Sequence, residues 1–201
     1  MRYYDYMKKY IAELLGTFAL TLVVGLSLHG TFPVPTPVLA GFVLMLFVYS
    51  IGSISGAHIN PAVTIGAWSI GKISSVEAGK YIVSQFVGAL LALLLINNVF
   101  GSATVVAVSD SVRNALAEGL GMAFFTFGIA SVIYGKVSSG ASGLVVGGSL
   151  LLGITIAVLL GSNGVLNPAV ALGIHSFGVM YVIAPLIGSI LGMQVYRQLQ
   201  S

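Results

Sequence analysis

Two Asn-Pro-Ala tripeptides are the groups in this apolar chain whose types and spacing could bind a solute. They comprise Asn60, Pro61 and Ala62 within SGAHINPAVT, and Asn167, Pro168 and Ala169 within SNGVLNPAVA. Asn can cap a helix by accepting its free N–H groups. Pro suits the first helical position because no N–H is needed there, and Ala favours helix. Each tripeptide therefore predicts the start of a short helix, with an amide available to an oxygen-bearing solute.

His58, two residues before the first of these Asn residues, has a side chain that titrates near neutral pH. It could gate a pore by protonation, or its ring could hold the loop while its carbonyl faces the pore; we favour the second interpretation. The three histidines lack metal-ligand spacing and the chain has no cysteine, so we place no metal and no cofactor. No nucleophile–base pairing or phosphate-binding loop is evident, and we expect no enzyme activity.

The composition indicates that lipid, rather than water, is the main solvent of the chain. Of 201 residues, 57% are apolar and only 6% are charged, whereas soluble domains carry about 25% charged residues. The net charge of +3 comes from scattered residues that form no nucleic-acid patch. The sequence therefore predicts an integral membrane protein.

Six apolar runs are long enough to cross a ~30 Å hydrocarbon core as helices of about 20 residues. They cover approximately Tyr10–Leu28, Pro37–Ile54, Lys80–Phe100, Arg113–Tyr134, Ser142–Gly161 and Gly178–Tyr196. Two segments that begin at the prolines, Pro61–Ile70 and Pro168–Phe177, are too short to cross and are predicted to be half-spans. The predicted fold class is an all-α membrane bundle of six spans and two re-entrant half-helices.

The two halves of the chain are a sequence repeat. Asn60 matches Asn167 at an offset of 107 residues, AELLG matches AEGLG at 105, and QFVGALLA matches PLIGSILG at 100. Each half holds three spans, an odd number, so the second half must be inverted relative to the first. We predict one domain over residues 1–201, with repeats at approximately 8–100 and 112–199.

Inversion brings the two half-helices in from opposite sides, so that their N-termini meet near the midplane. Irregular backbone at that depth must be buried in protein or line a wet cavity. Two positive helix ends facing inward disfavour cations and protons. A water molecule bound to both Asn amides would use its lone pairs there and could not easily relay a proton.

Glu13 and Glu118 lie inside predicted spans at equivalent repeat positions. A carboxylate in a membrane helix is costly and usually functional, so a proton relay or an ion site is one interpretation. The other is loop support, in which each carboxylate accepts the free backbone N–H groups of a loop that carries a half-helix. The symmetry and the lack of a basic partner favour loop support.

Basic residues predict the orientation of the chain. One side of the predicted bundle holds Arg2, Lys8, Lys9, Lys72, Lys80, Lys136 and Arg197. Only Arg113 falls on the other side. The positive-inside rule then places both termini in the cytoplasm, and we expect the cell (plasma or inner) membrane.

The paired NPA motifs, the AELLGTF start and Gln85 in the third span resemble those of the aquaporin, or major intrinsic protein, family. The resemblance covers nearly the whole chain, and two motifs in register are very specific. It implies a right-handed six-helix bundle, a pore in each subunit and a homotetramer in the lipid bilayer. It also implies loop support by Glu13 and Glu118, the role that we favour for His58 as well.

Family members have an outer selectivity filter of four positions, which by the resemblance are Ala40, Thr155, Gly164 and Val170. Water-selective relatives have large aromatic, His, small and Arg side chains there, whereas Val170 here stands in the place of the Arg. The filter is therefore expected to be wide and uncharged. Glycerol-conducting relatives carry Arg then Asp after the motif, and Val170–Ala171 does not match that pattern either.

We therefore predict a passive channel for water and other small neutral solutes. One alternative is a channel mainly for larger neutral solutes such as glycerol, urea or undissociated weak acids. A second alternative, from another class, is an ion- or proton-coupled carrier, because such carriers also use inverted repeats and broken helices and Glu13 and Glu118 could couple a proton.

Overall fold

The computed structural model describes residues 3–29, 32–101 and 107–201, and Arg2 lies outside them. These residues form eight α-helices and no strand. The helices are α1 (Tyr3–Ser27), α2 (Thr36–Ser55), α3 (Pro61–Ser69), α4 (Ser75–Phe100), α5 (Val112–Ile133), α6 (Ser139–Leu159), α7 (Pro168–Gly173) and α8 (Val179–Gln200). Six are long and apolar enough to span a membrane, and α3 and α7 are not. The predicted fold class is confirmed.

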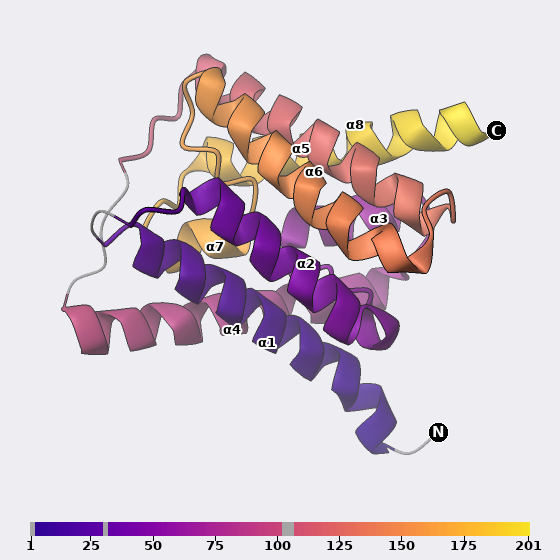
Figure 1. Cartoon of the computed structure of the whole chain (residues 1–201), viewed down its shortest axis with the longest axis horizontal. Coiled ribbons are helices and arrows are strands. Elements are labelled where there is room, and N and C mark those ends of the chain that lie inside the picture. The colour runs from indigo at the N-terminus through magenta and orange to yellow at the C-terminus, as the bar shows by residue number, and fades with distance from the viewer. Residues whose placement is uncertain (1–2, 30–31, 102–106) are drawn as a thin grey trace.

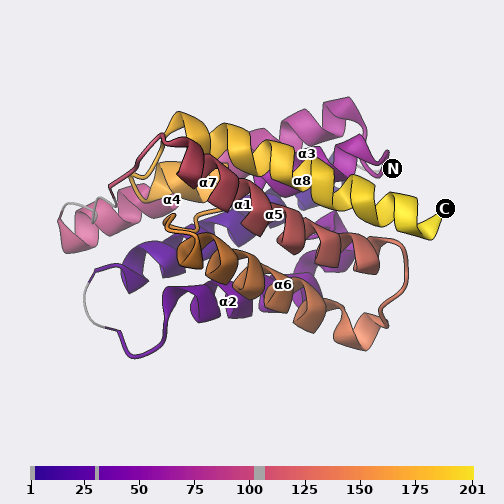
Figure 2. The ribbon, with the colours of Figure 1, turned by 90° about the horizontal axis from the view of Figure 1, so that it is seen from above.

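Both described chain ends lie at the same end of the bundle, which we call the terminal end (Figure 1). The opposite end, where α1 ends and α2 begins, is the distal end. The half-helix α3 runs from the middle toward the terminal end and leads into α4, while α7 runs from the middle toward the distal end and leads into α8 (Figure 2). The two half-helices therefore point in opposite directions, as the sequence predicts.

Small residues allow the long helices to pack closely. The principal pairs are α1 with α4, α5 with α8, α5 with α6, and α2 with α6. A methyl group added to Gly88 would collide with the carbonyl of Leu14, and one added to Gly188 would collide with the carbonyl of Gly119. Gly88 and Gly188 are 100 residues apart, the offset that relates α4 to α8. Backbone-to-backbone contact of this kind is typical of membrane helix interfaces.

Several helix bounds differ from those predicted, and three of the differences have a local cause. Helix α1 begins at Tyr3 and α4 at Ser75, rather than at Tyr10 and Lys80, because polar residues continue a helix beyond its apolar run. The Ser74 hydroxyl caps α4 by accepting the Glu77 N–H at 3.3 Å. Helix α7 ends at Gly173 rather than Phe177, since His175 has a left-handed backbone (φ 54°) that cannot continue a right-handed helix.

The glycine contacts predict the effect of adding one methyl group. We expect Gly188→Ala to lower the free energy of unfolding by about 1–3 kcal/mol, because the methyl group must push α8 away from α5. Gly148→Ala in α6 is the matched control, since nothing lies within 4 Å of its added methyl group. Thermal unfolding in detergent, followed by circular dichroism, measures both. Equal midpoints for the two variants would contradict the close α5–α8 contact.

Candidate functional site

The two Asn residues cap the half-helices. The Asn60 side-chain oxygen accepts the Ala62 N–H at 2.8 Å. The Asn167 oxygen accepts the N–H groups of Ala169 and Val170 at 3.1 and 3.3 Å. In each case Pro occupies the first turn, where its missing N–H costs nothing. The tips are thus built as the tripeptides predict.

The same two side chains also join the halves of the chain to each other. Asn60 Nδ2 donates to the Leu166 carbonyl at 3.0 Å, and Asn167 Nδ2 donates to the Ile59 carbonyl at 3.0 Å. These bonds are reciprocal, because each amide bonds the residue that precedes the opposite Asn. The tips of α3 and α7 therefore meet, and each Asn is 3% exposed.

A buried glutamate supports each loop. Glu13 accepts the N–H groups of His58 and Ile59 at 2.9 and 2.6 Å, together with the Ser55 hydroxyl at 2.7 Å. Its side chain is fully buried. A carboxylate offers about four lone-pair sites, so it can accept several orphan donors at once.

Glu118 repeats this arrangement in the second half. It accepts the N–H groups of Val165 and Leu166 at 3.1 and 2.8 Å and the Ser162 hydroxyl at 2.5 Å. Val165, Leu166 and Ser162 each lie 107 residues after their counterparts around Glu13. These are the contacts that loop support requires.

The supported loops hold an unusual backbone. Ile59 and Leu166 have φ values of 39° and 53°, in the left-handed region. Such a conformation in a non-glycine residue costs of order 1–3 kcal/mol. Both residues use this conformation to donate their N–H to a glutamate and to offer their carbonyl to the opposite Asn. Two loop positions earlier, Ala57 and Gly164 are left-handed as well.

The first half has an additional polar network around Gln85. Its side-chain amide nitrogen, Nε2, donates to Glu13 at 2.8 Å and to the Thr64 hydroxyl at 2.9 Å. The Thr64 hydroxyl lies 3.2 Å from Nδ1 of His58. Pro185 takes the place of Gln85 in the second half, and Val165 takes the place of His58. His58 is therefore held by its ring in a network that exists on one side only.

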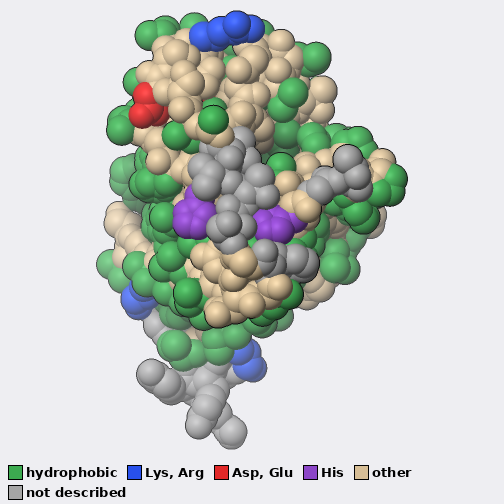
Figure 3. Space-filling model, turned by 90° about the vertical axis from the view of Figure 1, so that its left-hand side faces the viewer, with side chains coloured by type: hydrophobic (Ala, Val, Ile, Leu, Met, Phe, Trp, Pro, Cys, Tyr) green, Lys and Arg blue, Asp and Glu red, His purple; other side chains and the backbone are tan. Residues whose placement is uncertain are grey.

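A cavity of about 400 Å³ runs from the paired Asn residues toward the distal end. Helix α1 lines it with Leu20, Val24 and Leu28. His58, Asn60 and Asn167 supply polar groups at its inner part, and no Asp, Glu, Lys or Arg is among the described residues that line it. On the distal face, charged side chains lie toward the rim (Figure 3). The cavity is thus uncharged and largely apolar.

Three of the four predicted filter residues line this cavity, namely Ala40, Gly164 and Val170. Thr155 does not, and its hydroxyl donates to the Leu151 carbonyl of its own helix at 2.7 Å. Helix α6 instead lines the cavity with Leu150, Ile154 and Val158, which recur every four residues on one helical face. The residue of this helical turn that lines the cavity is Ile154, which precedes Thr155 in the chain.

Sequence reasoning did not single out several residues that hold the loops. Ser55 and Ser162 bond the glutamates, and the Tyr81 hydroxyl donates to the Ser55 carbonyl at 2.8 Å. The Tyr181 hydroxyl lies 3.4 Å from the Ser162 hydroxyl. The repeat itself was the available signal, because both pairs recur at the repeat offsets of 107 and 100 residues. No group of side chains that could hold a metal occurs in the described part of the chain.

Six membrane spans around two half-helices that meet tip to tip beside an uncharged cavity define a membrane channel. The family model described as "Major intrinsic protein" matches residues 1–196. The chain therefore belongs to the major intrinsic protein family, an integral membrane family whose members pass small neutral solutes.

Individual relatives agree with this family. The chain is 30% identical over 217 residues to aquaporin NIP1-1 of Arabidopsis thaliana, covering 96% of this chain and 73% of the relative. It is 35% identical over 178 residues to a probable aquaporin AqpM of Archaeoglobus fulgidus, covering 76% of this chain and 70% of the relative. The X-ray structure of the aquaglyceroporin from Plasmodium falciparum matches with a TM-score of 0.69 at 21% identity, covering 96% of this chain and 94% of that one. This last likeness concerns the fold.

The glutamate contacts predict a large loss of stability in Glu13→Gln. The new amide keeps one oxygen but turns its NH2 group toward either the His58 N–H or the Ile59 N–H, because these two donors bond different oxygens of Glu13. A buried donor without an acceptor costs about 1–3 kcal/mol. We expect a total loss of about 2–4 kcal/mol. Glu77→Gln is the control, because that partly exposed carboxylate pairs with Lys9 at the terminal end and is expected to contribute less than about 1 kcal/mol. Thermal unfolding in detergent that shows equal losses would contradict the assigned role of Glu13.

Proposed function

We propose that this chain is a passive channel for water and other small neutral solutes, with a wide and uncharged distal filter. The observation that carries the proposal is the amide pair. Each Asn uses its oxygen to cap a half-helix and one N–H to bond the opposite loop. An amide nitrogen has two N–H donors, so one donor of each Asn is left for a solute in the cavity.

Two donors side by side favour a solute that accepts hydrogen bonds, such as water, an alcohol or urea. The half-helix tips add partial positive charge at the same point, which opposes cations. The apolar walls offer no replacement for the hydration shell of an ion, so a charged solute would lose several kcal/mol on entry. Neutral solutes avoid this loss.

We propose that Ala40, Gly164, Val170 and Ile154 form the distal filter, with Ile154 in place of Thr155. None of these side chains is charged, and two are very small. Such a filter has room for solutes larger than water and lacks the fixed charge that would repel cations. Exclusion of cations then depends on the half-helix tips.

The location and assembly of the channel belong to the same proposal. The basic residues Lys72, Lys136 and Arg197 are at the terminal end, which supports cytoplasmic termini by the positive-inside rule. We propose the cell membrane as the location and a homotetramer as the assembly, as the family resemblance implies. Light scattering of the purified complex tests the tetramer directly.

A coupled carrier is the second candidate, and the network from Glu13 through Gln85 and Thr64 to His58 is the observation in its favour. It connects a buried carboxylate to the cavity wall. An amide nitrogen is a donor only, however, so Gln85 is a poor proton relay. Saturable uptake that needs a proton gradient would support the carrier, and unchanged uptake in Glu13→Gln would exclude coupling through that residue.

The channel proposal predicts fast osmotic water flow. We expect proteoliposomes subjected to an osmotic jump to change volume several-fold faster than empty vesicles, and to admit glycerol or urea as well. Stopped-flow light scattering measures both rates. Water flow no faster than in empty vesicles would contradict the channel, and exclusion of glycerol and urea would contradict the wide filter alone.

We predict that an Arg in the proposed filter narrows the range of solutes that permeate. We expect Val170→Arg to lower glycerol and urea permeability several-fold and to suppress any proton leak, because it adds bulk and fixed positive charge beside the cavity. Val170→Leu, which adds bulk without charge, separates these two effects. An unchanged solute range and proton leak in Val170→Arg would show that residue 170 does not form a constriction.

A further inference from the structure

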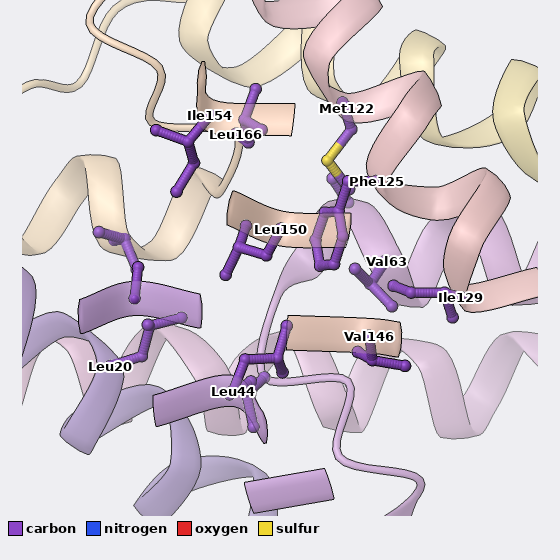
Figure 4. Close-up of a cluster of buried hydrophobic side chains, with 14 of the residues drawn as sticks. Leu20, Leu44, Val63, Met122, Phe125, Ile129, Val146, Leu150, Ile154 and Leu166 are labelled. Carbon is purple, nitrogen blue, oxygen red and sulfur yellow. The ribbon is translucent and has the colours of Figure 1, made fainter. Parts of the chain in front are cut away.

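The described residues that line the cavity extend from the distal end to the level of the paired Asn residues, and no residue of α3 or α8 is among them. Leu44 of α2, Phe125 of α5 and Leu150 of α6 line it and also belong to the buried hydrophobic cluster. Phe125 is 1% exposed and Leu44 is 2% exposed. In Figure 4 the Phe125 ring lies between Leu150 and Val63 of α3. Apolar side chains therefore close the path at this level.

The repeat shows which positions make this closure. Phe125 follows Glu118 by the same seven residues that separate Leu20 from Glu13, and Ile129 corresponds in the same way to Val24. Val63 corresponds to Val170 at the offset of the two motifs. Leu20, Val24 and Val170 line the open cavity, whereas Ile129 and Val63 are buried in the cluster and do not line it. In two of the three matched pairs, the residue of the distal half therefore faces the cavity and its counterpart in the terminal half does not, although Leu20 and Val170 belong to the same buried cluster.

The side chains differ in size between the two halves. Phe125 is larger than its counterpart Leu20, and Ile129 is larger than Val24. None of Leu44, Val63, Phe125 and Leu150 has a side-chain polar atom to bind water. An apolar constriction without such groups hinders a permeating water column by dewetting, and it selects solutes by size.

We propose that Phe125, with Leu44, Val63 and Leu150, forms an inner constriction that limits the size of solute and the rate of permeation. This inference rests on the proposed channel function. The distal filter then admits solutes to the cavity, and the Phe125 layer decides which of them cross to the terminal end. Phe125 is the specificity-determining residue of this layer because its ring fills the space between three helices.

Substitutions at residue 125 test the proposal in proteoliposomes. We expect Phe125→Ala to raise water and glycerol permeability at least several-fold and to admit larger polyols that the unaltered protein excludes. Phe125→Leu introduces the side chain found at the matching position in α1. We expect its permeability and size limit to lie between those of the unaltered protein and Phe125→Ala. Phe124→Ala is the control, because Phe124 is the adjacent residue and is 53% exposed on the outside of the bundle. Stopped-flow light scattering with a series of polyols of increasing size gives the rate and the size limit.

The outcomes separate this inference from the channel function itself. A higher size limit in Phe125→Ala, with Phe124→Ala unchanged, supports the constriction. The constriction is also supported if Phe125→Ala conducts and the unaltered protein does not. An equal size limit and rate in all variants that conduct overturns the constriction and leaves the channel intact. If neither the unaltered protein nor folded Phe125→Ala conducts, both proposals are overturned. If Phe125→Ala does not fold, the size limit of Phe125→Leu decides, since loss of stability alone does not admit larger solutes.

Discussion

The structure depends on how backbone N–H groups are satisfied at membrane depth. A loop in the hydrocarbon region has no water to bond its free donors, and each unsatisfied donor is costly. Glu13 and Glu118 solve this problem inside the protein, because each is fully buried and accepts two consecutive loop N–H groups. The strained residues Ile59 and Leu166 are held by these bonds, and the half-helices start where the strain ends. A buried carboxylate, which is usually costly within a membrane, thus stabilises the loops that carry the paired tips.

The internal symmetry is closest at the glutamate contacts and at the two Asn residues, and it is weaker elsewhere around the cavity. The serines, glutamates and strained residues recur at fixed offsets, because both halves must solve the same hydrogen-bonding problem. Gln85 and His58, by contrast, have Pro185 and Val165 as counterparts, and Leu20 has Phe125. The polar network therefore occurs in one half, and the cavity extends toward the distal end. Differences between matched positions are where the two halves acquire different roles.

Much of this arrangement could be predicted from sequence, for identifiable physical reasons. Apolar runs of membrane length predict the spans, and Asn followed by Pro predicts the two tips. Which residue of this turn of α6 lines the cavity could not be read from spacing, because one residue rotates a helix by about 100°; Ile154 lines it and Thr155 does not. The polar chain from Glu13 to His58 joins three separate elements and could be seen only once they were packed together. The proposed constriction at Phe125 likewise depends on side-chain volumes from four helices.

The reciprocal amide bonds have a consequence for how the protein is made. Asn60 bonds a carbonyl 106 residues further along the chain, and Asn167 bonds one 108 residues earlier. During synthesis the amino-terminal half therefore enters the membrane before its partner exists, and its loop tip has no completed acceptor. Glu13 is in place from the start and can hold that loop in a waiting state. Closure of the tips must therefore wait until Leu166 and Asn167 have been made, after the spans α5 and α6.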